Sequence, residues 1–154
     1  MSVIRGCFLA FSMYSRLPMP KTDWNEKNMR YMLCFFPFIG ALQGIFLYGL
    51  WKFCHFFALP VTVFILSGTA LPVLLTGGIH LDGFLDTMDA LHSYQNRERK
   101  LEILKDAHIG AFACIWAVCW ALLYAAALSL IQGREQLLLA GCGFFLSRAL
   151  SAVT

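Results

Sequence analysis

Residues 111–131, which include CIWAVCWALLYAAALSLI, contain no charged side chain. At a rise of about 1.5 Å per residue, a helix of this length crosses the roughly 30 Å hydrocarbon core of a bilayer. Only helices or closed barrels cross a bilayer, because every backbone polar group must be paired internally. This run therefore indicates a membrane protein and is the clearest predicted span of the chain.

Three other apolar runs have a similar length, at residues 29–51, 56–79 and 136–154. The second contains Pro60 and Pro72, and because proline lacks a backbone N–H, this run is expected to start late or to be broken. The whole chain is 59% hydrophobic and 14% charged, whereas soluble domains are about half apolar and roughly a quarter charged. We therefore predict one all-α domain over residues 1–154, a polytopic transmembrane helical bundle.

The fourth run is still apolar at Thr154, which predicts that residues 1–154 form the N-terminal part of a longer fold with further membrane helices. Within the first run, Gly40 and Gly44 are four residues apart. Small residues at this spacing let two membrane helices approach closely, although glycine is also common in such helices without that role.

Lysine and arginine alternate from one connection to the next. There are five up to the start of the first run, one between the first two runs, four between the second and third, and one before the fourth. Cytoplasmic connections of membrane proteins carry the excess of these residues. The pattern therefore places the N-terminus and a loop at residues 80–109 in the cytoplasm.

Charge and cysteine content exclude other classes of protein. The net charge of +3 forms no basic stripe with interleaved aromatic side chains, which argues against a nucleic-acid-binding protein. None of the six cysteines lies in a C-x-x-C pair, so we interpret them as small buried apolar residues rather than metal ligands or disulfides.

Three of the five aspartates fall within one short segment, at Asp82, Asp86 and Asp89. On a helix this spacing places them within about 60° of one another, on one face. Carboxylates so close together repel each other and are costly to desolvate near a membrane. Mg²⁺ offsets that cost, because it binds one or two carboxylates and completes its shell with substrate phosphates. The three aspartates are therefore candidate magnesium ligands, with a solvated helix face as the alternative.

The residues just before this segment fit a phosphate site. His80 lies two residues before Asp82, where it can bind phosphate or metal. Gly77 and Gly78 can adopt backbone conformations closed to other residues, and they let a ligand approach the chain. A helix that begins just after Gly78 would point its N–H groups at an anion.

Basic residues and a further acid follow in NRERKLEILKDAHIG. Arg97, Arg99 and Lys100 are candidate phosphate-binding residues, although they also satisfy the positive-inside pattern. Asp106 and His108 then precede Gly110. Acids for a metal and bases for phosphate in one connection are typical of a phosphoryl-transfer site, where positioning and charge neutralisation supply most of the catalysis.

Several stretches carry a family resemblance: TGGIHLDGFLDTMDALHS, RERKLEILKDAHIGAF, SRLPMP near the start, FFPFIGALQG in the first run and Ser147–Arg148 in the last. They resemble the cobalamin synthase family, the adenosylcobinamide-GDP ribazoletransferases. The resemblance covers essentially the whole chain, and its H-L-D-G-x-x-D-x-x-D core is specific. Asp82, Asp86 and Asp89 match the family's acidic motif, and Asp106 matches the aspartate of its I-x-x-D-x-x-x-G segment.

The resemblance implies a multi-pass, Mg²⁺-dependent enzyme of the bacterial inner membrane. It implies that adenosylcobinamide-GDP reacts with α-ribazole, or with its 5′-phosphate, and that GMP is released. The four matching aspartates are then the catalytic residues. Most of them would bind Mg²⁺, and one could instead accept the proton of the attacking hydroxyl. A homo-oligomeric assembly stays open. The family's chains are longer, so residues 1–154 alone are expected to lack activity if the remaining helices line the pocket.

Two other functions remain as alternatives. CDP-alcohol phosphotransferases catalyse nearly the same reaction, but their motif resembles D-G-x-x-A-R, whereas here Asp82-Gly83 is followed by FLDT. A divalent-cation transporter is the second alternative. Its carboxylates belong near the bilayer midplane, whereas these lie at the end of a predicted span, before a basic loop.

Overall fold

The computed structural model describes residues 2–106 and 108–152, and within them the chain forms helices and no strand. The predicted all-α class is confirmed. Positions 1, 107, 153 and 154 lie outside the described residues, so the predicted last span, 136–154, extends two residues beyond them. The helices are α1 (Ser2–Tyr14), α2 (Glu26–Met29), α3 (Phe36–Phe56), α4 (Val61–Thr76), α5 (Ile79–His92), α6 (Arg97–Ile103), α7 (Ala111–Ser129) and α8 (Arg134–Ser151), with a 3-10 turn at Leu33–Phe35.

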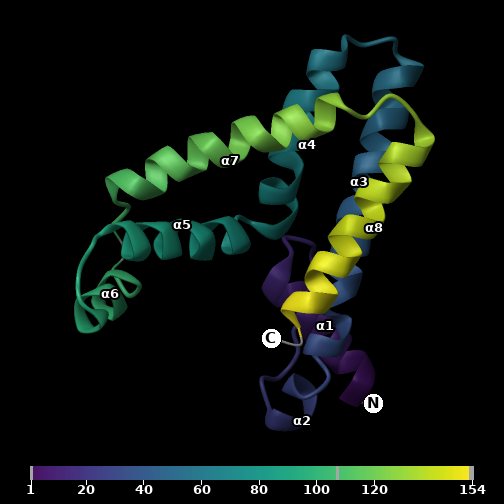
Figure 1. Cartoon of the computed structure of the whole chain (residues 1–154). Helices are drawn as coiled ribbons and strands as arrows, with labels where there is room; N and C mark the ends of the chain where they lie inside the picture. Colours follow the sequence, from purple (N-terminus) through teal and green to yellow (C-terminus); the bar gives the residue numbers. More distant parts are fainter. Residues whose placement is uncertain (1, 107, 153–154) are drawn as a thin grey trace.

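Two pairs of helices extend from a common corner, as Figure 1 shows. α3 and α8 lie side by side in one pair, and α5 and α7 lie side by side in the other. α4 stands at the corner and packs against both α3 and α7. An apolar cluster joins α3, α4, α7 and α8, and its buried members are Leu47, Cys54, Phe64, Leu128 and Leu137.

The contact between α3 and α8 depends on glycine. A Cβ added to Gly40 would lie 2.2 Å from the carbonyl oxygen of Phe144, and one added to Gly44 would lie 2.8 Å from the Cα of Gly141. Both separations are shorter than real Cβ atoms allow, so neither position accepts a side chain at this helix spacing. Of the two interpretations left open for Gly40 and Gly44, the structure shows the close approach, and α8 is the helix that approaches.

The predicted span at residues 56–79 contains one helix, α4, and a sharp bend follows it. α4 ends at Thr76, and α5 begins at Ile79 at an angle of 96° to it. The region expected as a loop at residues 80–109 consists largely of α5 and α6. The late start expected from Pro60 is confirmed, since α4 begins at Val61. The sequence-based loop is wrong over residues 80–92, because the aspartates of α5 make this helix too polar to resemble a span.

The bend itself has a local chemical cause. Gly77 and Gly78 have φ values of +71° and +87°, a left-handed conformation that glycine adopts without a Cβ clash. The Thr76 hydroxyl donates to the carbonyl oxygen of Pro72 at 2.7 Å and accepts from the backbone N of Gly78 at 3.3 Å. These contacts stabilise the end of α4 and direct the chain into α5.

Two segments are long and apolar enough to cross a membrane, Glu26–Phe56 and Ala111–Ser129, and the bent α4–α5 pair is a third if it counts as one broken span. Many large apolar side chains of α7 are exposed, as contact with lipid requires. Among the described helices, α8 does not meet the same criterion, because it contains Arg134, Glu135 and Arg148.

Candidate active site

The predicted acidic face lies on α5, which begins directly after Gly78, as the sequence predicts. Asp82 in its first turn is exposed, whereas Asp86 and Asp89 are partly buried. Asp82 and Asp86 are one helical turn apart, so their backbone positions are separated by about 6 Å along the axis. Asp82 is thus the one exposed acid of this face, and Asp86 lies one turn further along it.

Asp89 binds the beginning of α7. Its Oδ2 accepts a hydrogen bond from the backbone N of Gly110 at 2.7 Å, and its Oδ1 accepts one from the backbone N of Ala113 at 2.8 Å. Gly110 has no side chain with which to cap α7, so a carboxylate from another helix satisfies these unpaired donors. The positive end of the α7 dipole also favours a negative charge there. The spacing of the aspartates does not predict this role, for which the one local signal is a glycine where a capping side chain is usual.

Within residues 2–106 and 108–152, no three His, Cys, Asp or Glu side chains come close enough together to hold a metal ion. The predicted set of three magnesium ligands is therefore not assembled, since both oxygens of Asp89 are engaged by α7. The carboxylates of Asp82 and Asp86 accept no hydrogen bond from the described side chains and backbone groups. Two carboxylates completed by substrate phosphates are a usual set for Mg²⁺, so this pair fits the predicted ion.

The glycines of the bend lie beside Asp82. Gly77, Gly78 and Asp82 line an open hollow of about 510 Å³ together with three apolar side chains. Ligand sites commonly have volumes of about 300–1,000 Å³. The structure thus brings three of the predicted site residues together at one surface.

His80 lies on the other side of α5. At about 100° per residue, Asp82 and Asp86 are about 200° and 240° around the helix from it. The His80 ring stacks on Tyr14 with ring centroids 5.7 Å apart, and its centroid is 5.4 Å from that of Phe36. The predicted grouping of His80 with the acids is therefore not observed, because the rotation of the helix separates residues that are close in sequence.

The predicted phosphate-binding residues of α6 lie at the far end of α5 from the bend (Figure 1). α5 has 14 residues and is about 20 Å long, so Arg97, Arg99 and Lys100 do not adjoin Asp82. Arg99 forms an exposed ion pair with Glu102 at 2.6 Å. Their position favours the alternative interpretation, in which these residues follow the positive-inside pattern.

Asp106 lies in the exposed connection between α6 and α7. Its Oδ1 accepts hydrogen bonds from the side-chain Nδ1 of His108 at 2.6 Å and from the backbone N of His108 at 3.0 Å. These two contacts lower the pKa of Asp106 below its ordinary value. Its observed partner is thus His108, and no observed contact joins it to Asp82 and Asp86 within the described part of the chain.

Arg148 is a polar residue that the sequence-based site left out. It is half-buried on α8, with its guanidinium carbon 5.7 Å from the centroid of the Phe36 ring, which His80 also contacts. Arg148 and His80 line a second cavity, of about 260 Å³. The available sequence signal was the single charge in the otherwise uncharged run 137–150, since such a charge is costly in a membrane and often functional.

The known proteins that are similar to this chain all indicate the same family. The family model described as cobalamin-5-phosphate synthase matches residues 6–154. A protein of Lachnoclostridium phytofermentans named adenosylcobinamide-GDP ribazoletransferase is 42% identical over 99% of this chain and 58% of its own length. Proteins of the same name from Clostridium perfringens and Geobacillus thermodenitrificans are 40% and 31% identical over 71% and 77% of this chain, and over 44% and 48% of their own lengths. No solved structure gives a significant match.

The chain spans about half the length of these relatives, from 44% to 58%. The matched residues 6–154 include the acids of α5, the glycines of the bend and the contact between Asp89 and α7. The resemblance noted in the sequence is confirmed, and the chain belongs to the cobalamin-5-phosphate synthase family.

Proposed function

We propose that the protein joins adenosylcobinamide-GDP to α-ribazole, or to α-ribazole 5′-phosphate, and releases GMP. The observation that carries this proposal is the 42% identity to a ribazoletransferase over 99% of the chain. The acidic face of α5 beside the glycine-lined hollow supports it, because phosphoryl transfer depends mainly on positioning and on neutralising charge.

The proposed reaction is a displacement at phosphorus. The acceptor hydroxyl oxygen attacks the phosphorus on the cobinamide side of the diphosphate and forms a new P–O bond. The bond from that phosphorus to the bridging oxygen breaks, and GMP leaves with the bridging oxygen and its electron pair. Asp82 and Asp86 are the two acids of α5 available to accept the hydroxyl proton, which otherwise passes to solvent.

Asp82 and Asp86 are also the residues that would hold Mg²⁺. When bound, the ion supplies neutralisation of the charge that develops on the phosphate oxygens. The chain itself has two further tasks in this proposal. Gly77 and Gly78 leave room for the diphosphate in the hollow, and Asp89 holds α5 against α7 so that the acidic face keeps its orientation.

We further propose that the protein spans the bacterial inner membrane several times, with its N-terminus and residues 80–109 in the cytoplasm. The alternation of lysine and arginine between connections supports this orientation. A membrane-impermeant thiol reagent tests it on inside-out vesicles that contain a cysteine-free variant with Arg97→Cys. We expect labelling there and none in right-side-out vesicles, and the reverse result would refute the orientation.

The test of the activity is GMP release by membranes that contain the full-length protein and both substrates. We expect Asp82→Asn and Asp86→Asn each to lower turnover by about 100-fold or more, with partial recovery at high Mg²⁺. Asp23→Asn is the matched control, since Asp23 is an exposed acid of the N-terminal segment. Normal turnover in both α5 variants, release of CMP from a CDP-alcohol, or metal flux into liposomes without phosphate substrates would contradict the proposal.

A further inference from the structure

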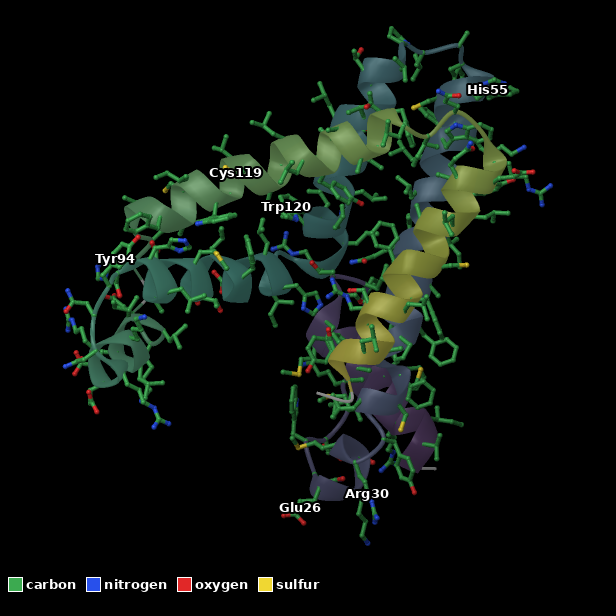
Figure 2. The ribbon with its side chains drawn as sticks, in the orientation of Figure 1. Glu26, Arg30, His55, Tyr94, Cys119 and Trp120 are labelled. Carbon is green, nitrogen blue, oxygen red and sulfur yellow. The ribbon has the colours of Figure 1, made fainter. Side chains whose placement is uncertain are left out.

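A cavity of about 260 Å³ lies where α4, α5, α7 and α8 meet, on the side of α5 away from Asp82 and Asp86. Trp120 of α7 forms part of its wall, and Figure 2 shows this side chain inside the angle between α7 and α4. A water molecule takes about 30 Å³ of liquid volume, so the cavity admits a polyatomic group. None of the residues that line it is acidic.

His80 is one of the residues that line this cavity, and its side chain has an unpaired polar atom. Its Nε2 is buried and has no hydrogen-bond partner among the described residues. The rings of Tyr14 and Phe36 hold the imidazole in place. A buried polar atom without a partner is unfavourable, so a ligand that pairs with Nε2 would stabilise this arrangement.

Arg148 brings a positive charge to the same cavity. The ion pairs within the described residues are Arg99–Glu102 and His108–Asp106, and Arg148 takes part in neither. Its guanidinium instead lies over the ring of Phe36. A half-buried charge without a counter-ion is costly, which makes an anion the favoured occupant of the cavity.

We propose that this cavity binds a phosphate group between the guanidinium of Arg148 and the Nε2–H of His80. The planar guanidinium can donate to two phosphate oxygens at once, and the imidazole tautomer with its proton on Nε2 adds a third hydrogen bond. Thr76 also lines the cavity, but its hydroxyl already donates to Pro72. The assignment of this phosphate to one of the two substrates rests on the proposed function, whereas the anion site itself does not.

Trp120 offers a direct signal for binding. The full-length protein, in phosphatidylcholine nanodiscs without Mg²⁺, is titrated with inorganic phosphate at constant ionic strength while tryptophan fluorescence is recorded. We expect a saturable change in the wild type that Trp120→Phe removes. Arg148→Gln is expected to weaken phosphate binding roughly ten- to hundredfold through the loss of charge-assisted hydrogen bonds, and Arg148→Lys is expected to recover part of it.

Matched variants separate the donors from general effects. His80→Phe keeps an aromatic ring against Tyr14 and Phe36 but removes the donor, so we expect binding to weaken about fivefold. Arg134→Gln removes an exposed charge from the same helix as Arg148, and it is expected to bind phosphate as the wild type does. Asp82→Asn, on the other face of α5, is expected to do the same. Thermal unfolding of each variant identifies any folding defect.

A wild type without a saturable response, or an Arg148→Gln variant that binds as tightly as the wild type, would overturn the proposal. A response that phosphatidylglycerol in the nanodisc suppresses supports the site and identifies a lipid headgroup as the source of the phosphate. GMP release measured in parallel separates the two proposals. If the wild type releases GMP but does not bind phosphate, the cavity site alone is refuted. If it binds phosphate but does not release GMP, the proposed function alone is refuted.

Discussion

The two helix pairs of this protein are joined in different ways. α3 and α8 meet through Gly40, Gly44 and Gly141, so that backbone lies directly against backbone. α5 and α7 meet through the carboxylate of Asp89, which accepts hydrogen bonds from the first turn of α7. The first contact depends on the absence of side-chain atoms, and the second depends on the presence of one acidic side chain.

Aromatic contacts add to the α5–α7 pair. The rings of Phe84 and Trp116 meet edge-on at 6.4 Å, and His92 lies 5.5 Å from Phe112 and 5.4 Å from Trp116 between ring centroids. Lipid provides no hydrophobic gain for helix association, so membrane helices join through close packing or polar groups. This protein uses both means: close packing joins the pair that carries Arg148, and a partly buried polar cap joins the pair that carries the acids.

Gly40→Leu should have the largest effect, because it acts on the close contact between α3 and α8. A Cβ at this position alone would lie 2.2 Å from a backbone oxygen of α8, so the helices must separate, and we expect a loss of about 3 kcal/mol in the free energy of unfolding. This loss of stability is measured by following the helical circular dichroism signal during denaturant-induced unfolding. Gly49→Leu is the control on the same helix, because a Cβ there meets nothing within 4 Å. An equal loss in both variants would show that close packing does not hold α3 to α8.

Asp89→Asn should have the next largest effect. The amide keeps the shape of the side chain but offers one oxygen to two backbone donors, so we expect a loss of about 2 kcal/mol in the free energy of unfolding. We also expect turnover to fall in the GMP-release assay without recovery at high Mg²⁺, unlike Asp82→Asn. Recovery by Mg²⁺ would assign Asp89 to the metal instead of the α7 cap.

Gly110→Ala tests the same cap from the other side. Its Cβ would lie 2.5 Å from Oδ1 of Asp89, so the carboxylate must move, and we expect a loss of about 1 kcal/mol in the free energy of unfolding. The double variant with Asp89→Asn should lose less than the sum of the two, since both changes act on the same hydrogen bonds. Gly143→Ala is the control, because a Cβ there meets nothing within 4 Å. Strict additivity would argue against a shared contact.

Asp106 should show the smallest effect, because it lies outside both helix pairs and is exposed. The side chain and backbone N of His108 lower the pKa of Asp106, so their stabilisation is present above the unfolded-state pKa and is lost as the pH falls through the lower folded-state value. His108→Ala keeps the backbone donor and should raise this pKa only part of the way to its ordinary value. Carbon-13 NMR titration of the carboxyl measures it, and an unchanged pKa would show that the contact with the His108 side chain contributes nothing.

Features that depend only on residues close together in the sequence were predictable from it. The uncharged run at 111–131 corresponds to α7, and Gly40 and Gly44 mark a close helix contact. The start of α5 after Gly78 also agrees. The late start of α4 after Pro60 was predictable too, but helix α5 was not, since its aspartates make residues 80–92 resemble a polar connection.

The partners of the polar residues were harder to predict than the helices. The spacing of Asp82, Asp86 and Asp89 predicts one common role. In the structure, however, Asp89 caps the N-terminus of α7. His80 precedes Asp82 by two residues, but it turns toward a different cavity, where Arg148 arrives from a helix distant in sequence. Spacing along one helix predicts which side chains share a face, and it does not predict what another helix brings to that face.

The amino-acid sequence by itself determined three things about this protein. It showed that the chain forms apolar helices, at which positions glycine permits a bend or a close contact, and to which family the chain belongs. Each of these depends on composition and local pattern. The tertiary structure decided which acid lines the hollow, which one caps α7, and that His80 and Arg148 share a cavity. Those outcomes depend on contacts between helices far apart in the sequence, whose geometry is set by packing.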